Sequence, residues 1–210
     1  MKLKIIIADD HAVLRKGLKL IILEEFTNAQ ISEASTAEDA LKAIRKEKFD
    51  LVISDISMPG RSGIDLLKQI REEFPFLPVL ILSMHPEEHY AIRALKAGAS
   101  GYVTKDTASE ELAKAIRKII SGKKYISSSL ADMLADNVSV DSALLPHELL
   151  SDREFEVLLL IASGKGISKI AETLSLSVNT ISTYRSRLLE KMKLKSNADL
   201  IHYALEQNLV

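Results

Sequence analysis

The sequence predicts an α/β domain, a doubly wound five-stranded parallel sheet, followed by a small all-α domain. Over roughly the first 120 residues, short apolar runs alternate five times with amphipathic helical patterns. This alternation is typical of a parallel sheet covered by helices on both faces. Over roughly the last 60 residues, the periodic segments all have helical spacing. We therefore expect two domains joined by a linker.

Composition narrows the classes of protein to consider. The 210 residues allow a core in each of two domains, and the net charge of -1 means that any nucleic-acid-binding surface must be local. The absence of cysteine excludes disulfides, thiolate nucleophiles and zinc–cysteine sites, and it fits a reducing compartment. Acidic residues appear by Asp9, too early for a signal peptide, and no apolar run approaches the roughly 20 residues of a membrane span. We expect a soluble cytoplasmic protein without a membrane partner.

The elements of the first domain can be placed one by one. Apolar runs predict strands at 3–8, 29–34, 51–54, 79–82 and 100–104. Amphipathic patterns predict the helices between and after them, at 12–25, 37–46, 64–74, 86–98 and 109–121. Thr36 is the expected cap of the second helix, Pro86 suits the first position of the fourth, and Gly98 suits its C-terminal end.

Polar side chains follow the strands at their carboxyl ends. Asp9 and Asp10 follow the first strand, Asp55 the third, Ser83 the fourth and Lys105 the fifth. Parallel strands share one rim, so these groups should meet in a crevice. Crowded carboxylates raise one another's pKa, and Mg²⁺ relieves this repulsion. Because no glycine-rich phosphate loop is present, a carboxylate itself is the candidate carrier of a phosphoryl group, although Asp55 alone could simply cap the next helix.

These residues carry a resemblance to a known family. Residues 1–122 resemble the receiver domain of two-component response regulators, a CheY-like, flavodoxin-like fold, in Asp9-Asp10, Asp55, Met58-Pro59-Gly60, Ser83, Tyr102 and Lys105. The resemblance implies that a sensor histidine kinase phosphorylates Asp55. It also implies that Asp10, Asp55 and the backbone carbonyl of Ser57 bind Mg²⁺ directly, with Asp9 acting through water.

The resemblance also assigns three further residues. Lys105 would pair with the phosphoryl oxygens, where the alternative is a surface lysine. Ser83, often threonine in the family, would donate a hydrogen bond to the phosphoryl group and move the loop after the fourth strand. The alternative for Ser83 is a helix cap. Tyr102 would change rotamer as Ser83 moves, and its alternative is a half-buried packing aromatic.

A linker is expected at 123–146. A serine-capped helical pattern runs from Ser127 to Ala135, and residues from Asn137 to Pro146 have no sustained period. We therefore expect one short helix followed by a mobile section.

Residues 147–210 form the predicted helical domain. Ser151 to Glu154 is a capping box that begins a helix. Helices at 167–174 and 178–192, separated by a turn at 175–177, suggest a helix-turn-helix, and a last helix follows at 197–207. Residues 177–196 contain five basic residues and one acidic residue, Glu190, although the domain as a whole is neutral. Such a local concentration of positive charge favours phosphate contact, and the alternative is a solvated basic face.

This domain resembles the LuxR-type helix-turn-helix in Leu150-Ser151-Asp152-Arg153-Glu154, Gly164, Ile170-Ala171-Glu172, Leu174, Ser177, Thr180-Ile181 and Lys191-Met192. The order of domains makes the chain similar to NarL/FixJ-type response regulators. Tyr184 and Lys169 depart from the family pattern, which often has His and Glu there. The resemblance implies base contacts by Ser182, Thr183 and Ser186, and phosphate or sugar contacts by Thr180, Tyr184, Arg187 and Lys191. Arg185 could contact either.

We therefore expect a transcription regulator, not an enzyme, that binds double-stranded DNA and forms homodimers when Asp55 is phosphorylated. A phosphohydrolase would need its nucleophile on the first strand with an acid two residues later, but Ala12 stands two residues after Asp10. An adaptor whose second domain binds protein is the other alternative. A metal pair at His85 and His89 is disfavoured by Pro86 between them, and the remaining histidines look isolated.

Overall fold

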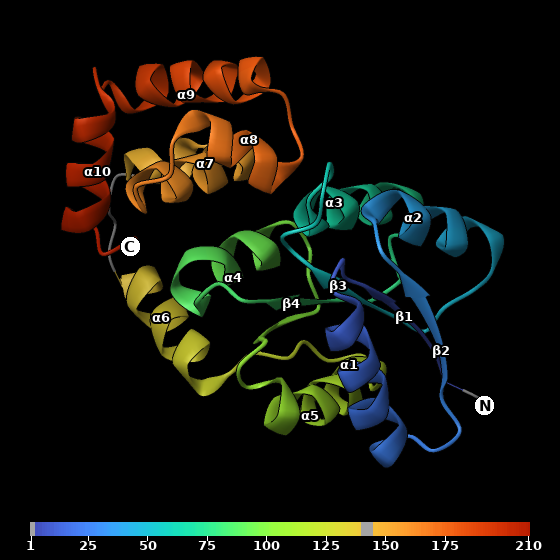
Figure 1. Cartoon of the computed structure of the whole chain (residues 1–210). Coiled ribbons are helices and arrows are strands. Elements are labelled where there is room, and N and C mark those ends of the chain that lie inside the picture. The colour runs from blue at the N-terminus through green and yellow to red at the C-terminus, as the bar shows by residue number, and fades with distance from the viewer. Residues whose placement is uncertain (1–2, 140–144) are drawn as a thin grey trace. The chain divides into compact units, whose positions relative to one another are not determined.

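The computed structural model describes residues 3–139 and 145–210, and the chain divides into two compact units, Met1–Ser139 and Val140–Val210 (Figure 1). The mobile section that we predict after the linker helix falls largely on residues 140–144, outside the described residues.

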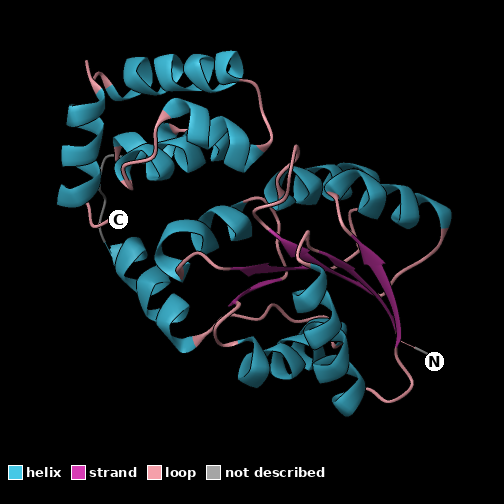
Figure 2. Ribbon diagram, in the orientation of Figure 1, coloured by secondary structure: helices cyan, strands magenta, loops and turns pink. Residues whose placement is uncertain are grey.

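The first unit contains a parallel sheet in the order β2-β1-β3-β4-β5, which is the flavodoxin-like order (Figure 2). Its strands are β1 (Lys4–Ala8), β2 (Gln30–Ala34), β3 (Leu51–Asp55), β4 (Val79–Ser83) and β5 (Gly101–Thr104). The predicted fold class is confirmed. The strand ends differ by a residue or two from the expected ones, and Asp55 is the last residue of β3 instead of the residue after the apolar run.

Five helices cover the two faces of this sheet. They are α1 (Ala12–Glu25), α2 (Ala37–Lys46), α3 (Gly63–Glu73), α4 (Glu87–Lys96) and α5 (Ala108–Ile120). Helices α1 and α5 lie on one face, and α2, α3 and α4 lie on the other (Figure 1). Because strand side chains alternate, Ile5, Ile53 and Leu82 pack toward α1 and α5 while their neighbours face the other layer. Burial on both faces explains why these strands are continuously apolar in sequence.

Both ends of α4 differ from the sequence prediction. Pro86 is the N-cap of α4, so the helix begins at Glu87. The helix ends at Lys96 with Ala97 as C-cap, and Gly98 follows with a φ of 101°, a left-handed value that favours glycine.

The linker helix α6 (Ser128–Ser139) is longer than predicted and belongs to the first unit. It packs against α4, and Leu130 is buried at its start. Tyr125, just before it, forms an isolated parallel bridge with Gly101, so the linker begins as an extension of the sheet edge.

The second unit consists of a short 3₁₀ helix η1 (Pro146–Leu149) and the helices α7 (Asp152–Ala162), α8 (Ile167–Leu174), α9 (Val178–Met192) and α10 (Asn197–Glu206). The capping box of Ser151 and Glu154 is present as predicted. The turn between α8 and α9 is also as predicted: Ser175 adopts a left-handed φ of 53°, and the Ser177 side chain accepts a hydrogen bond from the Thr180 amide. Among the described residues, no helix is long and apolar enough to cross a membrane.

Candidate functional site

The strand register determines which polar residues meet at the rim of the sheet. Ala8 lies opposite Ser54 in the pairing of β1 with β3, so Asp9 falls beside Asp55. In the pairing of β4 with β5, Ser83 lies opposite Thr104, and the Lys105 amide extends this ladder by donating to the Ser83 carbonyl at 2.8 Å. The predicted meeting of these residues at one rim is confirmed.

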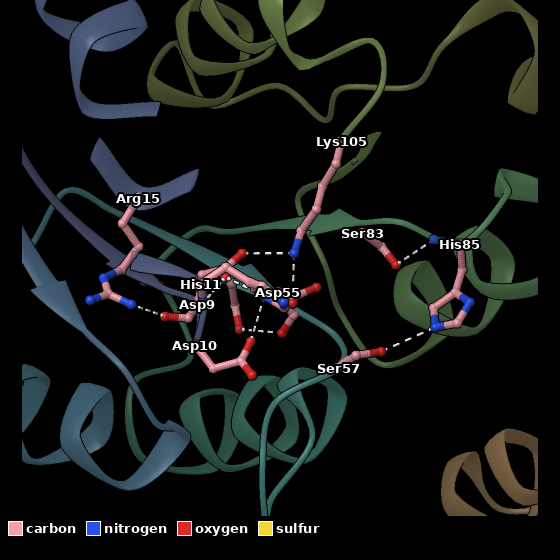
Figure 3. A network of polar contacts seen from close by, with 10 residues as sticks. Asp9, Asp10, His11, Arg15, Asp55, Ser57, Ser83, His85 and Lys105 are labelled. Carbon is pink, nitrogen blue, oxygen red and sulfur yellow. Dashed lines mark hydrogen bonds and ion pairs between the residues drawn. The ribbon is translucent and has the colours of Figure 1, made fainter. Parts of the chain in front are cut away.

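Two buried carboxylates and one ammonium form the centre of this site (Figure 3). The Lys105 Nζ lies 2.7 Å from Asp55 Oδ2 and 2.8 Å from Asp9 Oδ2. The side chains of Lys105, Asp9 and Asp55 are only 4%, 1% and 2% exposed. Burial by itself would lower the pKa of Lys105, but the two carboxylates outweigh it and raise that pKa above its ordinary value. The surface-lysine alternative for Lys105 is therefore wrong.

Asp55 combines burial with an available oxygen. Burial raises its pKa to about 6, against the opposing effect of Lys105 and with a further rise from Asp9. Within the described residues, Asp55 Oδ1 is buried and has no hydrogen-bond partner. A buried oxygen left without a donor is suited to a metal ion or to a new covalent bond.

The structure also shows why α3 starts close to Asp55. A Cβ added at Gly63 would lie 1.8 Å from the Asp55 carbonyl oxygen, so only glycine permits this approach. Nothing in the local sequence pattern distinguishes Gly63 from an ordinary helix-start residue, so its role could not be predicted from the sequence.

A divalent cation could be held at the same rim. Asp9, Asp10, His11 and Asp55 each offer a ligand atom, and these atoms lie within 4.8 Å of one another. The carboxylate oxygens are the donors that Mg²⁺ prefers, and the unpartnered Asp55 Oδ1 among them supports the fit. The role of the Ser57 carbonyl as a further ligand stays a prediction.

His11 is not isolated, and that part of the sequence analysis is wrong. Its Nδ1 lies 2.8 Å from Asp10 Oδ1 and 3.3 Å from Asp9 Oδ1. Its place directly after two aspartates at the N-cap of α1 was the signal that could have placed it at the rim.

Ser83, His85 and Tyr102 form a hydrogen-bonded group beside this site. The Ser83 hydroxyl accepts from the His85 amide at 3.0 Å, and the Tyr102 hydroxyl donates to the His85 carbonyl at 2.8 Å. Tyr102 is fully buried, not half-buried, and burial raises the pKa of its phenol. Full burial fits a packing aromatic, and the predicted change of rotamer stays a prediction. The His85 ring lies 3.1 Å from the Ser57 hydroxyl, which joins the loops after β3 and β4 (Figure 3).

The second candidate site is the exposed face of α9. Exposed side chains there include Ser182, Thr183, Ser186, Arg187 and Lys191, whereas Thr180, Tyr184 and Arg185 are half-buried. Ile181, Leu188 and Met192 form the buried side of the helix. Leu189, which follows Leu188 in the helix, is only half-buried.

Several of the predicted DNA-contacting residues have partners within the chain. The hydroxyls of Ser182, Thr183 and Ser186 each donate to the carbonyl four residues earlier in α9. Arg185 Nε donates to the Asn197 side chain at 2.5 Å, which ties α9 to the start of α10. These bonds leave the hydroxyl oxygens able to accept, and they fix where each group points.

Lys191 Nζ donates to Glu154 Oε2 at 2.6 Å. Burial would raise the pKa of Glu154, but Lys191 and Ser151 outweigh it and hold that pKa below its ordinary value. Lys191 therefore links α9 to the capping box of α7, and its predicted phosphate contact stays a prediction.

Comparison with known proteins identifies the family of each of the two units. Residues 5–117 match the family model of the response regulator receiver domain, and residues 148–204 match that of the bacterial regulatory proteins of the luxR family. The chain belongs to the NarL/FixJ family of response regulators. As a member of this family it is a transcriptional response regulator with a LuxR-type DNA-binding domain, and not an enzyme.

Similar response regulators cover the whole chain. Oxygen regulatory protein NreC is 36% identical over 216 residues in Staphylococcus epidermidis and 37% identical over 215 residues in Staphylococcus carnosus, with 99% of each chain covered. Among solved structures, RcsB from Salmonella enterica serovar Typhimurium, bound to promoter rprA in the presence of the phosphomimetic BeF₃⁻, has a TM-score of 0.67 at 27% identity. That alignment covers 97% of this chain and 98% of RcsB.

Proposed function

We propose that a sensor histidine kinase phosphorylates Asp55 of this response regulator, and that the phosphorylated chain dimerises and binds specific DNA sequences to regulate transcription. The observation that carries the proposal is the rim of the sheet, where Lys105 faces a buried Asp55 that has one oxygen unpartnered. We also propose that it acts in the cytoplasm, where it would meet both the kinase and the DNA.

The proposed chemistry needs one covalent step. Asp55 Oδ1 attacks the phosphorus of the phosphohistidine, the P–O bond forms and the P–N bond to the kinase imidazole breaks. We propose that Asp9, Asp10, Asp55 and the Ser57 carbonyl hold Mg²⁺, which neutralises charge on the transferred group when bound. The Lys105 ammonium is already 2.7 Å from Asp55, where it can pair with phosphoryl oxygens. Ser83 would donate a hydrogen bond to the phosphoryl group and move the loop after β4, and Tyr102 would change rotamer as Ser83 moves.

The proposed output is the α9 surface. The N-terminal part of a recognition helix enters the major groove, so Ser182, Thr183 and Ser186 would face bases, while Thr180, Tyr184, Arg187 and Lys191 would face the backbone. Arg185, fixed by Asn197, would reach base or phosphate. Solved RcsB structures are described as DNA complexes and as two dimers bound to two parallel DNAs, which supports a dimeric output for this chain.

The first test is phosphorylation itself. The full chain is incubated with Mg²⁺ and a small acyl phosphate donor, and intact-mass spectrometry follows the gain of one phosphoryl group. The wild type should gain it and Asp55→Asn should not. Asp106→Asn is the matched control, because Asp106 is an exposed carboxylate on the same rim. Phosphorylation that persists in Asp55→Asn would overturn the proposed acceptor.

The second test joins the acceptor to DNA binding. A pool of genomic fragments is selected with and without the donor, for wild type and Asp55→Asn. We expect enrichment of a repeated half-site that requires both donor and Asp55, with affinity that falls steeply as salt increases. Enrichment that is the same with and without the donor would mean that phosphorylation does not control DNA binding. No enrichment would favour the adaptor alternative.

A further inference from the structure

We propose that Glu87 holds the start of the linker helix α6 against the first turn of α4, and that phosphorylation of Asp55 releases it. The proposal rests on the proposed function and adds a route by which the acceptor reaches the linker. It begins with one carboxylate oxygen: Glu87 Oε2 accepts hydrogen bonds from the hydroxyls of Ser127 at 2.7 Å and Ser129 at 2.6 Å. We call these three residues the linker clasp.

The linker clasp is a strong contact for its size. Glu87 is only 9% exposed, so the carboxylate is largely removed from water. A charged acceptor bound by two hydroxyls at such short distances is worth more than two neutral hydrogen bonds. Loss of both donors would leave a buried carboxylate with fewer partners, which raises the free energy of the docked linker.

The clasp also begins helix α6. The Ser127 Oγ that donates to Glu87 accepts a hydrogen bond from the Leu130 amide at 3.1 Å, as a helix N-cap does. Leu130 is fully buried, and Tyr125 donates its amide to the Ser100 carbonyl at 2.8 Å on the sheet edge. Glu87 therefore orients the hydroxyl that caps α6 at the point where the chain leaves the sheet.

Only three residues lie between Ser83, at the end of β4, and Glu87. Between them, His85 donates its amide to the Ser83 hydroxyl and accepts from the Tyr102 hydroxyl through its carbonyl. Pro86, with its φ held at -55°, joins His85 to Glu87 as a stiff link.

This short path predicts how the signal travels. A Ser83 hydroxyl that turns to a phosphoryl group on Asp55 gives up its bond to the His85 amide. The backbone of His85 then shifts, and the stiff link at Pro86 carries the shift into the first turn of α4, where Glu87 lies. The two hydrogen bonds of the clasp share one oxygen, Glu87 Oε2, so a displacement of Glu87 weakens both.

The test uses hydrogen–deuterium exchange of the full chain, with Mg²⁺, in the absence and presence of BeF₃⁻ as a phosphoryl mimic. The readout is exchange of amides in 125–135. In the wild type, BeF₃⁻ should speed this exchange by roughly tenfold, since local opening follows the loss of strong hydrogen bonds. Glu87→Ala and the double variant Ser127→Ala/Ser129→Ala should show fast exchange without BeF₃⁻ and no further increase with it.

Glu88→Ala is the matched control, because Glu88 lies next to Glu87 on the first turn of α4 and is exposed. It should behave as the wild type. Glu87→Gln, which keeps an accepting oxygen but loses the charge, should fall between wild type and Glu87→Ala.

The outcomes separate this proposal from the proposed function. Binding of BeF₃⁻ is read independently by ¹⁹F NMR, with Asp55→Asn as the non-binding reference. If BeF₃⁻ binds and the linker amides do not change, the clasp proposal is wrong while the acceptor site stands. If BeF₃⁻ does not bind the wild type, the proposed acceptor site fails first. Slow exchange in Glu87→Ala, equal to that of wild type, would also overturn the clasp.

Discussion

The rim of the sheet and the face of α9 use polar side chains in opposite ways. At the rim, Lys105 and two aspartates are almost fully buried, and the lysine pairs with both carboxylates while Asp55 Oδ1 stays without a hydrogen-bond partner among the described residues. On α9, the hydroxyls of Ser182 and Thr183 are exposed and donate hydrogen bonds to carbonyls of their own helix. The rim therefore has a defined chemistry in the absence of any partner, whereas the function of α9 depends on the partner that covers it.

Two lysines illustrate the difference in burial between the rim and α9. Lys105 is 4% exposed and faces two carboxylates, while Lys191 is 42% exposed and faces Glu154 alone. An ion pair at the surface contributes little because solvent screens it, but a buried charge that loses its partner is costly.

The largest expected effect follows from this contrast. In Mg²⁺-free protein at neutral pH, Lys105→Ala should destabilise the first unit by about 3–5 kcal/mol, because it leaves Asp9 and Asp55 buried without their cation. Lys191→Ala should destabilise the second unit less, by about 1–2 kcal/mol. Glu154 is buried, but it keeps the hydrogen bond from the Ser151 amide, and the lysine that is removed is 42% exposed. Native-state hydrogen exchange measures both, with amides of β1, β3 and β4 for the first unit and of α7 for the second. Equal effects would show that burial does not separate the two lysines.

The pKa of Asp55 predicts the next effect. Its value of about 6 in the folded protein lies above the ordinary 3.8, so the folded state holds a proton more tightly than the unfolded state. This group therefore stabilises the fold less as pH rises from about 4 to 6, and above that range its ionised form costs about 3 kcal/mol. Asp55→Asn removes this cost. In metal-free protein, the variant should match wild type in stability near pH 4 and exceed it by about 3 kcal/mol at pH 7.

Urea unfolding of the first unit at several pH values, in the presence of a chelator, measures this difference. Asp106→Asn serves as the control, since it removes an exposed carboxylate of the same rim and should show no such growth with pH. A gap that shrinks as pH rises would mean that Asp55 is stabilised as an anion by its neighbours, against the direction of its raised pKa.

Metal addition sharpens the same contrast. Mg²⁺ at a hundred times its dissociation constant should stabilise the first unit by about 2.7 kcal/mol, because it binds the folded rim and not the unfolded chain. Asp55→Asn should lose most of this gain, and the stability of the second unit should not respond in either protein. Thermal unfolding across a Mg²⁺ titration, with hydrogen exchange to separate the units, tests this. A matching gain in the second unit would indicate a general salt effect.

The sequence predicts the rim better than it predicts α9, and the reason is physical. Parallel strands bring Asp9, Asp55 and Lys105 to one edge whatever the details of their loops, so residue order alone determines that they meet. Contacts that the order of the strands does not determine could not be predicted from the sequence. His11 meets the aspartates through a side-chain rotamer, and Gly63 matters because of an approach between backbones that no local pattern encodes.

The linker illustrates the same limit. Its helix was predicted as short, but α6 continues to Ser139, and its start is fixed by Glu87, which lies forty residues away from Ser127 in sequence. Helical periodicity indicates amphipathic faces and caps, but it does not indicate the tertiary contact at the start of this helix. On α9 the helix and its buried side are predictable, but the partners of Arg185 and Lys191 are not.

The smallest effect concerns how α9 meets DNA. Arg187 is exposed on α9, and as a phosphate contact it should supply affinity without sequence preference. Arg187→Ala should weaken binding to operator and unrelated DNA alike by roughly fivefold to tenfold and reduce the slope of log affinity against log salt by about one. Fluorescence anisotropy with both DNAs over a range of salt concentrations measures this.

The double variant Ser182→Ala/Thr183→Ala is the matched comparison on the same helix. If these hydroxyls face bases, the variant should lose affinity for the operator more than for unrelated DNA, with an unchanged salt slope, because it removes no charge. A change of sequence preference in Arg187→Ala, together with uniform weakening in the hydroxyl variant, would reverse the two assignments. It would mean that α9 lies in the groove rotated about its axis, with its basic side toward the bases.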